Sequence, residues 1–438
     1  MIYVVRSGDS LTSIAKRYGV SLERLRSDNG LLPEQPLVPG QALVVFIPKE
    51  TYQVRSGDTI YGIARQAGIS ARELIQRNPS LAQGAPLTVG EHLTLRLKEE
   101  PEGSLMVNGY AYPHIEQRVL RQAMPYLTDL SLFSYGFRED GALVPLADSR
   151  LLAEASLFGA GAVLVLTSID ESGTFSSQRA SHLFQDQRLQ EVVLDQLLQV
   201  MLEKGYLGLD VDFEYVEERD KEAFFHFLGR ARERLHQDGF FLHVDLAPKT
   251  HAQQSGPLYA AHDYSVIGAI ADSVLLMTYE WGYAYGPPMA VAPLPQVEEV
   301  LQYGVTEIAP GKIQLGIPNY GYDWTLPYEP SRRAATIGNQ EAVRLAGQVG
   351  AEIQFDTVSQ APYFRIYTGG NCPSGLVRGC PQHQGQAESG PGIRPAWGGV
   401  LEPDASLPPE LGDPQRPVSH SGRAVTFFSP PLDFCPPL

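Results

Sequence analysis

The sequence predicts an α/β protein in which a domain built on a parallel sheet follows two small α+β modules. From residue 105 onward, apolar runs alternate with amphipathic stretches, as expected for strands joined by crossover helices. Before residue 98, one sequence pattern occurs twice, at an offset of 49 residues. A chain of 438 residues is long enough to contain both parts.

The first hundred residues are a tandem repeat. The segment YVVRSGDSL at 3–11 recurs as YQVRSGDTI at 52–60. Each copy predicts a strand, a Gly-Asp turn, two helices and a strand, with Ser10 and Thr59 as N-caps of the first helices. The copies resemble LysM modules over residues 1–47 and 51–97. That resemblance implies binding to peptidoglycan or to chitin-like polymers of N-acetylglucosamine.

The same resemblance implies which residues would line the two glycan grooves. A single Ser-Gly-Asp-Ser is more simply interpreted as a turn, but two complete modules in register favour the functional interpretation. Two weak grooves on one chain would also raise the local concentration of the protein on a polymer. The groove residues expected from the resemblance are Gly8, Asp9, Ser10, Leu11, Gly57, Asp58, Thr59 and Ile60.

A charged segment with Pro and Gly, residues 98–105, is predicted to be a linker to the larger domain. Helices are expected between the strands of that domain, for example over 217–237, where Phe224, Phe227, Leu228 and Ala231 keep helical spacing. Strands are predicted near 107–112, 128–135, 161–168, 207–214, 240–247, 272–280 and 313–320.

One predicted strand, GLDVDFE at 208–214, carries three acids at strict alternation. Because side chains alternate between faces, Asp210, Asp212 and Glu214 share one face, and apolar side chains occupy the other. Crowded carboxylates raise one another's pKa, which suits a general acid. The alternative is an edge strand with solvated acids, but the apolar opposite face disfavours it.

This strand resembles the D-G-x-D-x-D-x-E signature of glycoside hydrolase family 18, with Leu207 in place of the first acid. The resemblance implies a (β/α)8 TIM barrel over residues 106–367 and retaining catalysis assisted by the substrate's acetamido group. Glu214 would be the general acid and base, and Asp212 would orient the acetamide. Asp210 would support Asp212, and Tyr279 would hydrogen-bond the acetamide carbonyl. No metal or other cofactor is implied.

Polar and aromatic side chains follow other predicted strands. MTYEW at 277–281 resembles the M-x-Y-D element of the family, with Glu280 in place of the Asp. Taken singly, such aromatic residues more often belong to a core than to a sugar platform. Together with NGYAYP at 108–113 and TYEWGY at 278–283, the two modules resemble the spore-germination branch of the family, the cortex-lytic N-acetylglucosaminidases. The substrate-binding residues expected are Tyr110, Glu280, Trp281, Asn319, Tyr320 and Trp324.

Composition limits the classes of molecule that this protein is expected to bind. A formal net charge of −16 argues against nucleic-acid binding and is compatible with a neutral glycan. No apolar run is long enough to predict a membrane span, and the N-terminus does not have the pattern of a signal peptide. The three cysteines suggest neither a disulfide framework nor a metal site. We expect a monomer of the spore coat or cortex, made in the mother-cell cytoplasm by the resemblance.

The last 71 residues, 368–438, differ from the rest of the chain. They hold 13 of the 34 prolines and all three cysteines, and composition predicts disorder. Degenerate codons for residues 375–412, read one nucleotide later, permit a run typical of the family's last helix and eighth strand. We therefore expect a reading-frame shift between about Tyr367 and Gly375, and a barrel without its eighth strand. An inactive glycan-binding coat or wall protein, or a product that does not fold, are the alternatives to an enzyme.

Overall fold

The structure is a computed structural model that describes residues 1–366 apart from residues 85, 100, 102 and 171–172. It also describes the backbone of two later strands, β17 (Val377–Gly379) and β18 (Arg423–Phe428). The disorder predicted for 368–438 otherwise falls outside the described residues.

Each N-terminal module has the predicted order of strand, two helices and strand, and the two outer strands pair antiparallel. The predicted N-caps are confirmed, because Ser10 Oγ accepts from Ser13 N at 3.1 Å and Thr59 Oγ1 accepts from Gly62 N at 3.0 Å. The first module contains β1 (Ile2–Val4), α1 (Leu11–Tyr18), α2 (Leu22–Asp28) and β2 (Ala42–Val44). The second contains β3 (Pro48–Gln53), α3 (Ile60–Ala67), α4 (Ala71–Arg77), η1 (Pro79–Gln83) and β4 (His92–Leu97).

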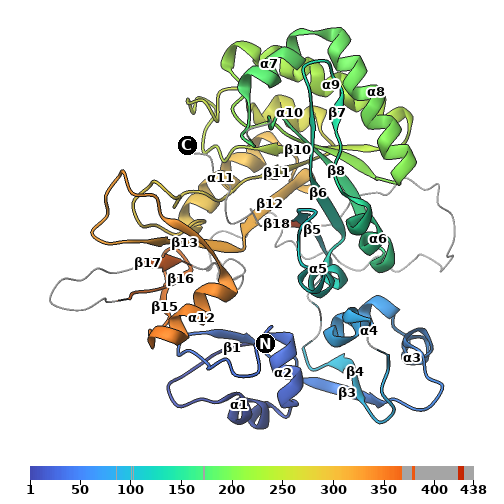
Figure 1. The fold of residues 1–438 in the computed structure, drawn as a ribbon, viewed down its shortest axis with the longest axis vertical. Helices are drawn as coiled ribbons and strands as arrows, with labels where there is room; N and C mark the ends of the chain where they lie inside the picture. Colours follow the sequence, from blue (N-terminus) through green and yellow to red (C-terminus); the bar gives the residue numbers. More distant parts are fainter. Residues whose placement is uncertain are drawn as a thin grey trace.

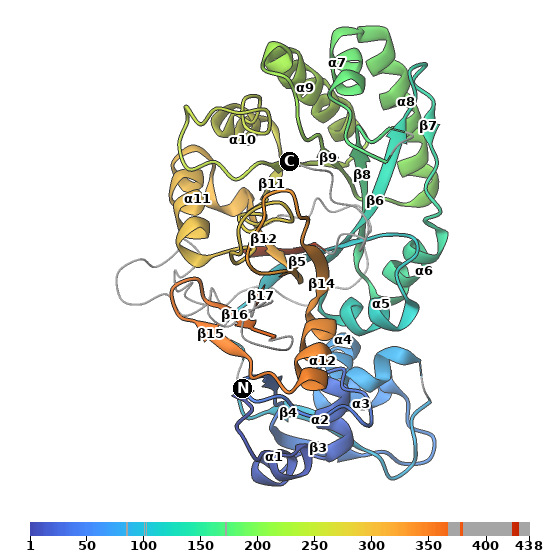
Figure 2. The same ribbon diagram turned by 60° about the vertical axis from the view of Figure 1, so that its left-hand side comes forward.

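All seven predicted strands of the larger domain are present and pair in parallel in chain order. Helices surround them, as Figures 1 and 2 show. The strands are β5 (Leu105–Ala111), β6 (Asp129–Phe137), β8 (Gly161–Thr167), β9 (Gly208–Asp212), β10 (Phe241–Leu246), β11 (Ser273–Leu276) and β12 (Ile313–Pro318). The helices are α5 (Gln117–Ala123), α6 (Ser149–Phe158), α7 (Ser177–Gln185), α8 (Gln187–Lys204), α9 (Lys221–Gln237), α10 (Tyr264–Ile270) and α11 (Leu294–Glu307).

The structure differs from the expectation at the seam of the barrel, which is the position between its first strand, β5, and the last of these seven strands, β12. The region before residue 367 supplies only seven barrel strands, as predicted, and alone would leave β5 and β12 unpaired at this seam. The predicted seven strands before residue 367 are confirmed, and the structure adds β18, from further along the chain, which pairs in parallel with both β12 and β5 at this position. Ladder hydrogen bonds come from the backbone, so many different sequences can occupy such a position.

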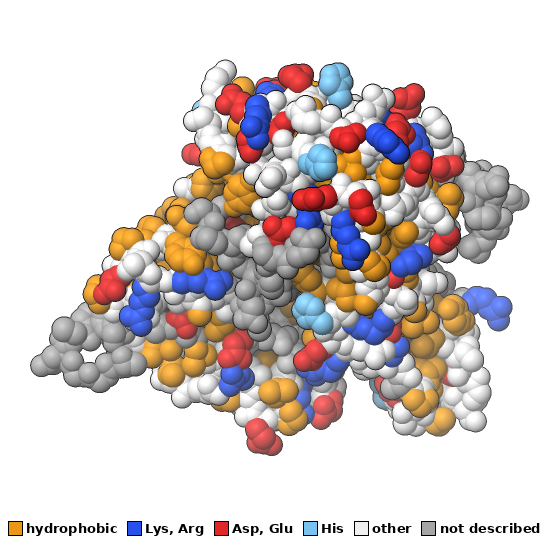
Figure 3. All heavy atoms as spheres, turned by 45° about the horizontal axis from the view of Figure 1, so that its top comes forward, with side chains coloured by type: hydrophobic (Ala, Val, Ile, Leu, Met, Phe, Trp, Pro, Cys, Tyr) orange, Lys and Arg blue, Asp and Glu red, His pale blue; other side chains and the backbone are white. Residues whose placement is uncertain are grey.

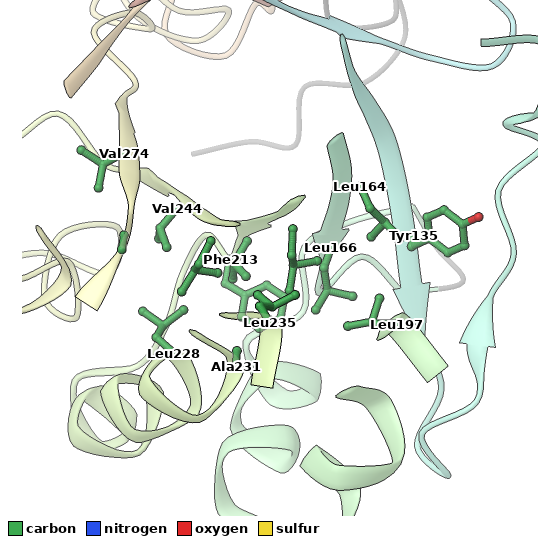
Figure 4. Close-up of a cluster of buried hydrophobic side chains, with 14 of the residues drawn as sticks. Tyr135, Leu164, Leu166, Leu197, Phe213, Leu228, Ala231, Leu235, Val244 and Val274 are labelled. Carbon is green, nitrogen blue, oxygen red and sulfur yellow. The ribbon is translucent and has the colours of Figure 1, made fainter. Parts of the chain in front are cut away.

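The alternation of β9 separates core from site as predicted. Leu209, Val211 and Phe213 are buried in the main apolar core between the sheet and the helices. In Figure 4, Phe213 lies among side chains from α9 and from β8. The opposite face of β9 therefore directs its acids into the barrel.

An α/β insertion follows β12 and packs against the first module (Figures 1 and 2). Val38 is buried in one cluster with Ile337, Ala346 and Phe364, and Ile353 N donates to Pro39 O at 2.9 Å. The insertion contains β13 (Tyr320–Trp324), β14 (Ala335–Gly338), α12 (Asn339–Val349), β15 (Gln354–Asp356) and β16 (Ala361–Phe364), with β17 between β13 and β16.

Arginines link the two modules to each other and to the barrel. Arg24 of the first module donates to Thr94 Oγ1 at 2.6 Å in the second. Arg72 Nε and Gln76 Nε2 of the second module donate to Pro125 O, next to the barrel helix α5, at 3.1 and 2.7 Å. The modules are therefore held against the larger domain by hydrogen bonds and by the Val38 contact.

The surface carries mixed charge. On the face drawn in Figure 3, acidic and basic side chains are interspersed with hydrophobic and neutral ones. Within the described residues, no helix has both the length and the apolar character needed to cross a bilayer.

Candidate active site

The three predicted acids come together at the carboxyl end of β9. Asp210 and Asp212 lie within the strand and are buried. Glu214 is half-buried and lies two residues beyond the strand end, in a turn where Tyr215 has φ +55°. In a parallel barrel this end of the strands is where sites form, so the position of Glu214 suits catalysis although it is not itself in the strand.

Asp210 is hydrogen-bonded from beneath by residues of two other strands. Tyr110 of β5 donates its hydroxyl to Asp210 Oδ2 at 2.6 Å, and Ser131 Oγ of β6 lies 3.5 Å from the same oxygen. The same Tyr110 hydroxyl lies 3.0 and 3.1 Å from the two carboxyl oxygens of Asp245, on β10. Two carboxyl groups therefore share one phenol.

Burial sets the protonation of these acids. It raises the pKa of Asp210 to about 7, against hydrogen bonds from Tyr110, Ser131 and Asp245 that lower it. Burial and then the charge of Glu214 raise the pKa of Asp212 well above its usual range. Burial, with the charge of Glu280, raises the pKa of Glu214 to about 7. Near neutral pH, protonated carboxyls are therefore present in this cluster.

Tyr279 and Glu280 follow β11 at the same end of the barrel. Burial, followed by the charges of Asp245 and Asp212, raises the pKa of Tyr279 well above its usual range, so its hydroxyl keeps its proton. Glu280 has φ +64° and accepts hydrogen bonds from Tyr322, at 2.8 and 2.9 Å, and from Tyr320. Glu280 is thus fixed in place, and its charge acts on Glu214.

The predicted substrate-binding residues divide into two groups. Glu280 and Tyr320 meet directly, and Trp281 and Asn319 are half-buried nearby in sequence. Tyr110 lies under the acids, with its hydroxyl on carboxyl oxygens. Trp324 is 2% exposed and donates Nε1–H to Gly286 O at 3.0 Å, so it belongs to the core and presents no free ring face. The geometry gives Tyr110 and Trp324 supporting positions instead of the sugar contact expected of them.

The predicted glycan-groove residues hold the turns of the two modules. Asp9 Oδ2 accepts from Tyr3 Oη at 2.5 Å and from Arg6 N at 2.9 Å, and Asp58 does the same with Tyr52 and Arg55 at 2.9 and 2.7 Å. Gly8 and Gly57 adopt φ of +85° and +87°, which favours glycine. Leu11 and Ile60 begin α1 and α3 and pack against the module cores. Their contact with glycan stays a prediction.

Asp245 and His243 are site residues that the sequence reasoning missed. Burial lowers the pKa of His243 to about 3, so the ring is neutral, and its Nδ1 lies 2.7 Å from Ser273 Oγ. The signal was present, because His243 and Asp245 alternate with Leu242, Val244 and Leu246. This is the pattern that identified the acids of β9.

One group of side chains could be considered for a metal ion. Ligand atoms of Asp210, His243 and Asp245 lie within 4.8 Å of one another. The Tyr110 hydroxyl already bridges the two carboxyls, and the imidazole has a serine partner. His243 Nε2, by contrast, is buried and has no hydrogen-bond partner among the described residues, so hydrogen bonds satisfy only part of this group.

The chain is similar to proteins of known families. The model for glycosyl hydrolases family 18 matches residues 163–371, and the LysM domain model matches residues 3–46 and 52–96. The chain is 37% identical over 373 residues to the cortical fragment-lytic enzyme of Bacillus subtilis (strain 168), covering 83% of this chain and 85% of that one. It is also 37% identical over 371 residues to the cortical fragment-lytic enzyme of Bacillus anthracis, covering 84% and 86%.

Solved structures agree with this relationship. The spore cortex-lytic enzyme SleL of Bacillus cereus matches with a TM-score of 0.70 and 33% identity, covering 87% of this chain and 88% of that one. SleL of Bacillus megaterium QM B1551 matches with a TM-score of 0.69 and 34% identity over the same shares. The acids of β9, the parallel barrel, the two repeats and these relatives together show that the chain belongs to glycoside hydrolase family 18 and carries two LysM domains.

Proposed function

We propose that this chain is an N-acetylglucosaminidase that hydrolyses the glycan strands of spore-cortex peptidoglycan. The observation that carries the proposal is the acid cluster, in which half-buried Glu214 has a pKa of about 7 beside buried Asp212 and Asp210. Two relatives named for cortical-fragment lysis, similar over most of both chains, support the substrate class. The LysM domains would hold the enzyme on peptidoglycan at the spore cortex.

The proposed chemistry is retaining and assisted by the substrate. Glu214 donates its proton to the leaving glycosidic oxygen while the acetamido oxygen attacks the anomeric carbon, and the sugar–oxygen bond breaks. Asp212 orients the acetamide and stabilises the positive charge of the oxazolinium intermediate, and the Tyr279 hydroxyl donates to the acetamide oxygen. Glu214, now ionised, then takes a proton from the water that opens the ring.

The test replaces Glu214 by Gln, which keeps the shape of the side chain but cannot deliver a proton. General acid catalysis is worth roughly 10²–10⁴-fold, so release of N-acetylglucosamine-ended products from purified cortex fragments should fall by about that factor. Glu218→Gln is the matched control, since Glu218 is an exposed acid four residues away. Products are counted by mass spectrometry after reduction of the new ends. Undiminished release by Glu214→Gln would rule out this residue as the acid.

The alternative, an inactive glycan-binding protein, gives a different result. The wild-type chain would then sediment with insoluble peptidoglycan yet release no product at any pH. Sedimentation and product release measured on the same sample therefore separate the two functions.

A further inference from the structure

We infer that Asp245 is a positioning residue of this active site, which shares a proton with Asp210 and so leaves Asp212 free to act with Glu214. The inference rests on the proposed function for its catalytic part. The sharing of a proton between Asp245 and Asp210 does not depend on the proposed function, because it concerns only hydrogen bonds among side chains of β5, β9 and β10.

The Tyr110 hydroxyl has one hydrogen, yet it lies 2.6 Å from Asp210 Oδ2 and 3.0 and 3.1 Å from the two oxygens of Asp245. Both carboxyls are buried, with exposures of 0% and 4%. Two ionised carboxylates around one phenol hydrogen would be left poorly paired in a medium of low dielectric, which is costly. One carboxyl therefore keeps a proton, placed in the hydrogen bond between Asp210 and Asp245.

None of the groups with the largest electrostatic effect on Asp245, among the residues that the structure describes, is a cation. His243 Nε2 lies 3.6 Å from Asp245 Oδ1, but burial keeps the imidazole neutral. Among the described residues, the titratable groups with the largest effects on Asp245 or in contact with it include Asp210, Asp212, Glu214, Tyr110, Tyr279 and His243. These groups are acids, phenols and a neutral imidazole, and none of them carries a positive charge. The negative charge of the Asp210–Asp245 pair is therefore reduced by a bound proton.

The pairing has a consequence for Asp212. Asp210 takes its hydrogen bonds from Tyr110, Ser131 and Asp245. The buried Oδ1 of Asp212 receives no hydrogen bond from the described residues, and Glu214 is the charged group that acts on it most. Asp212 is thereby left to accept a hydrogen bond from the acetamide N–H of a substrate, while Asp245 keeps Asp210 in place beneath it.

Two substitutions of Asp245 separate hydrogen bonding from packing. Asp245→Asn keeps an N–H that can donate to Asp210, whereas Asp245→Leu is of similar size and cannot donate. With a chromogenic N-acetylglucosamine oligomer, we expect kcat of the Asn variant within about threefold of wild type. The Leu variant should lose about tenfold or more in kcat, with KM changed by less than about threefold. Equal impairment of both variants, or a Leu variant with wild-type kcat, would overturn the inference.

A second measurement needs no activity, so it separates failure of this inference from failure of the proposed function. A carboxyl whose pKa is raised in the folded state binds more protons there than in the unfolded state. The melting temperature therefore falls as pH rises from the unfolded pKa, about 4, toward the folded one. Asp245→Asn removes this contribution, so the melting temperature of the variant minus that of wild type should increase from about pH 5 to about pH 8.

A difference that stays constant over this range would show that Asp245 holds no extra proton and would overturn the inference. Zinc or magnesium chloride provides the remaining check at fixed pH. A rise in the melting temperature of wild type, absent in Asp245→Asn, would identify a cation site in place of a shared proton. No response to either salt supports proton sharing.

Discussion

At the scale of single residues, the charge on Glu280 helps to keep Glu214 protonated. Tyr320 and Tyr322 donate to Glu280 and hold its carboxylate in place, and its charge adds to burial in raising the pKa of Glu214 to about 7. With Glu280 nearby, Glu214 is an acid that is partly protonated at neutral pH.

Glu280→Gln should therefore move the alkaline limb of the pH–rate profile. Glu214 must carry a proton, so activity falls as pH rises through its pKa. Removing the negative charge lets Glu214 ionise at a lower pH, and the limb should shift down by roughly half to one pH unit. Profiles of kcat/KM against pH on cortex fragments measure the shift, with Glu299→Gln, an exposed acid of α11, as the control. A shift of the alkaline limb to higher pH would contradict the inference that the charge of Glu280 raises the pKa of Glu214.

At the scale of elements, the sequence predicts best where a period is strong. All seven barrel strands follow from apolar runs, and the acids of β9 follow from alternation over the short run 208–214. The same alternation places His243 and Asp245 on one face of β10, so the sequence carries the same signal for these two residues. Burial of Trp324 could not be predicted, because it depends on contacts such as Gly286 that are distant in sequence. β18 was missed because its β-branched and aromatic run, RAVTFF, lies among prolines that dominate composition.

The position of β18 between β5 and β12 can be tested with one proline. Val425 pairs with Leu315 on one side and Val107 on the other, so a proline there removes a ladder N–H in an interior strand. We expect Val425→Pro to destabilise the protein by about 3 kcal/mol or more, seen as a lower midpoint in urea, whereas Val425→Thr should stay close to wild type. Equal midpoints for the two variants would mean that β18 does not close the barrel in solution.

At the scale of the whole molecule, the first LysM domain is fixed to the insertion of the barrel. Gly40 has φ +86°, and a Cβ there would lie 1.8 Å from Ile353 O. A cavity of about 350 Å³ adjoins this contact, lined by residues of both parts, including Gln41, Gln340 and Tyr363. The frame shift expected before residue 375 stays a prediction, to be settled by sequencing codons 365–375.

Gly40→Ala should displace the first LysM domain, because the clash is with backbone. Gly90 holds the corresponding place in the second domain, since each glycine donates its N–H to the residue before its Arg-Ser-Gly-Asp turn, at 2.8 Å. Gly90 has φ +92° and open space around its Cβ, so Gly90→Ala reports the backbone strain alone. We expect Gly40→Ala to cost about 1–3 kcal/mol more than Gly90→Ala and to increase the radius of gyration in X-ray scattering. Identical scattering curves would show that the contact between Gly40 and Ile353 adjusts to the added methyl group without displacement of the first LysM domain.

The attachment through Val38, Pro39 and Gly40 also bears on the lengths of the products. A binding domain on a loose tether lets the catalytic site reach many bonds around one point of attachment. A domain clamped to the barrel presents the polymer at one spacing, so cuts fall at a set distance from where the strand is held. The distribution of fragment lengths would then be narrow, and it would broaden when the clamp is released by Gly40→Ala.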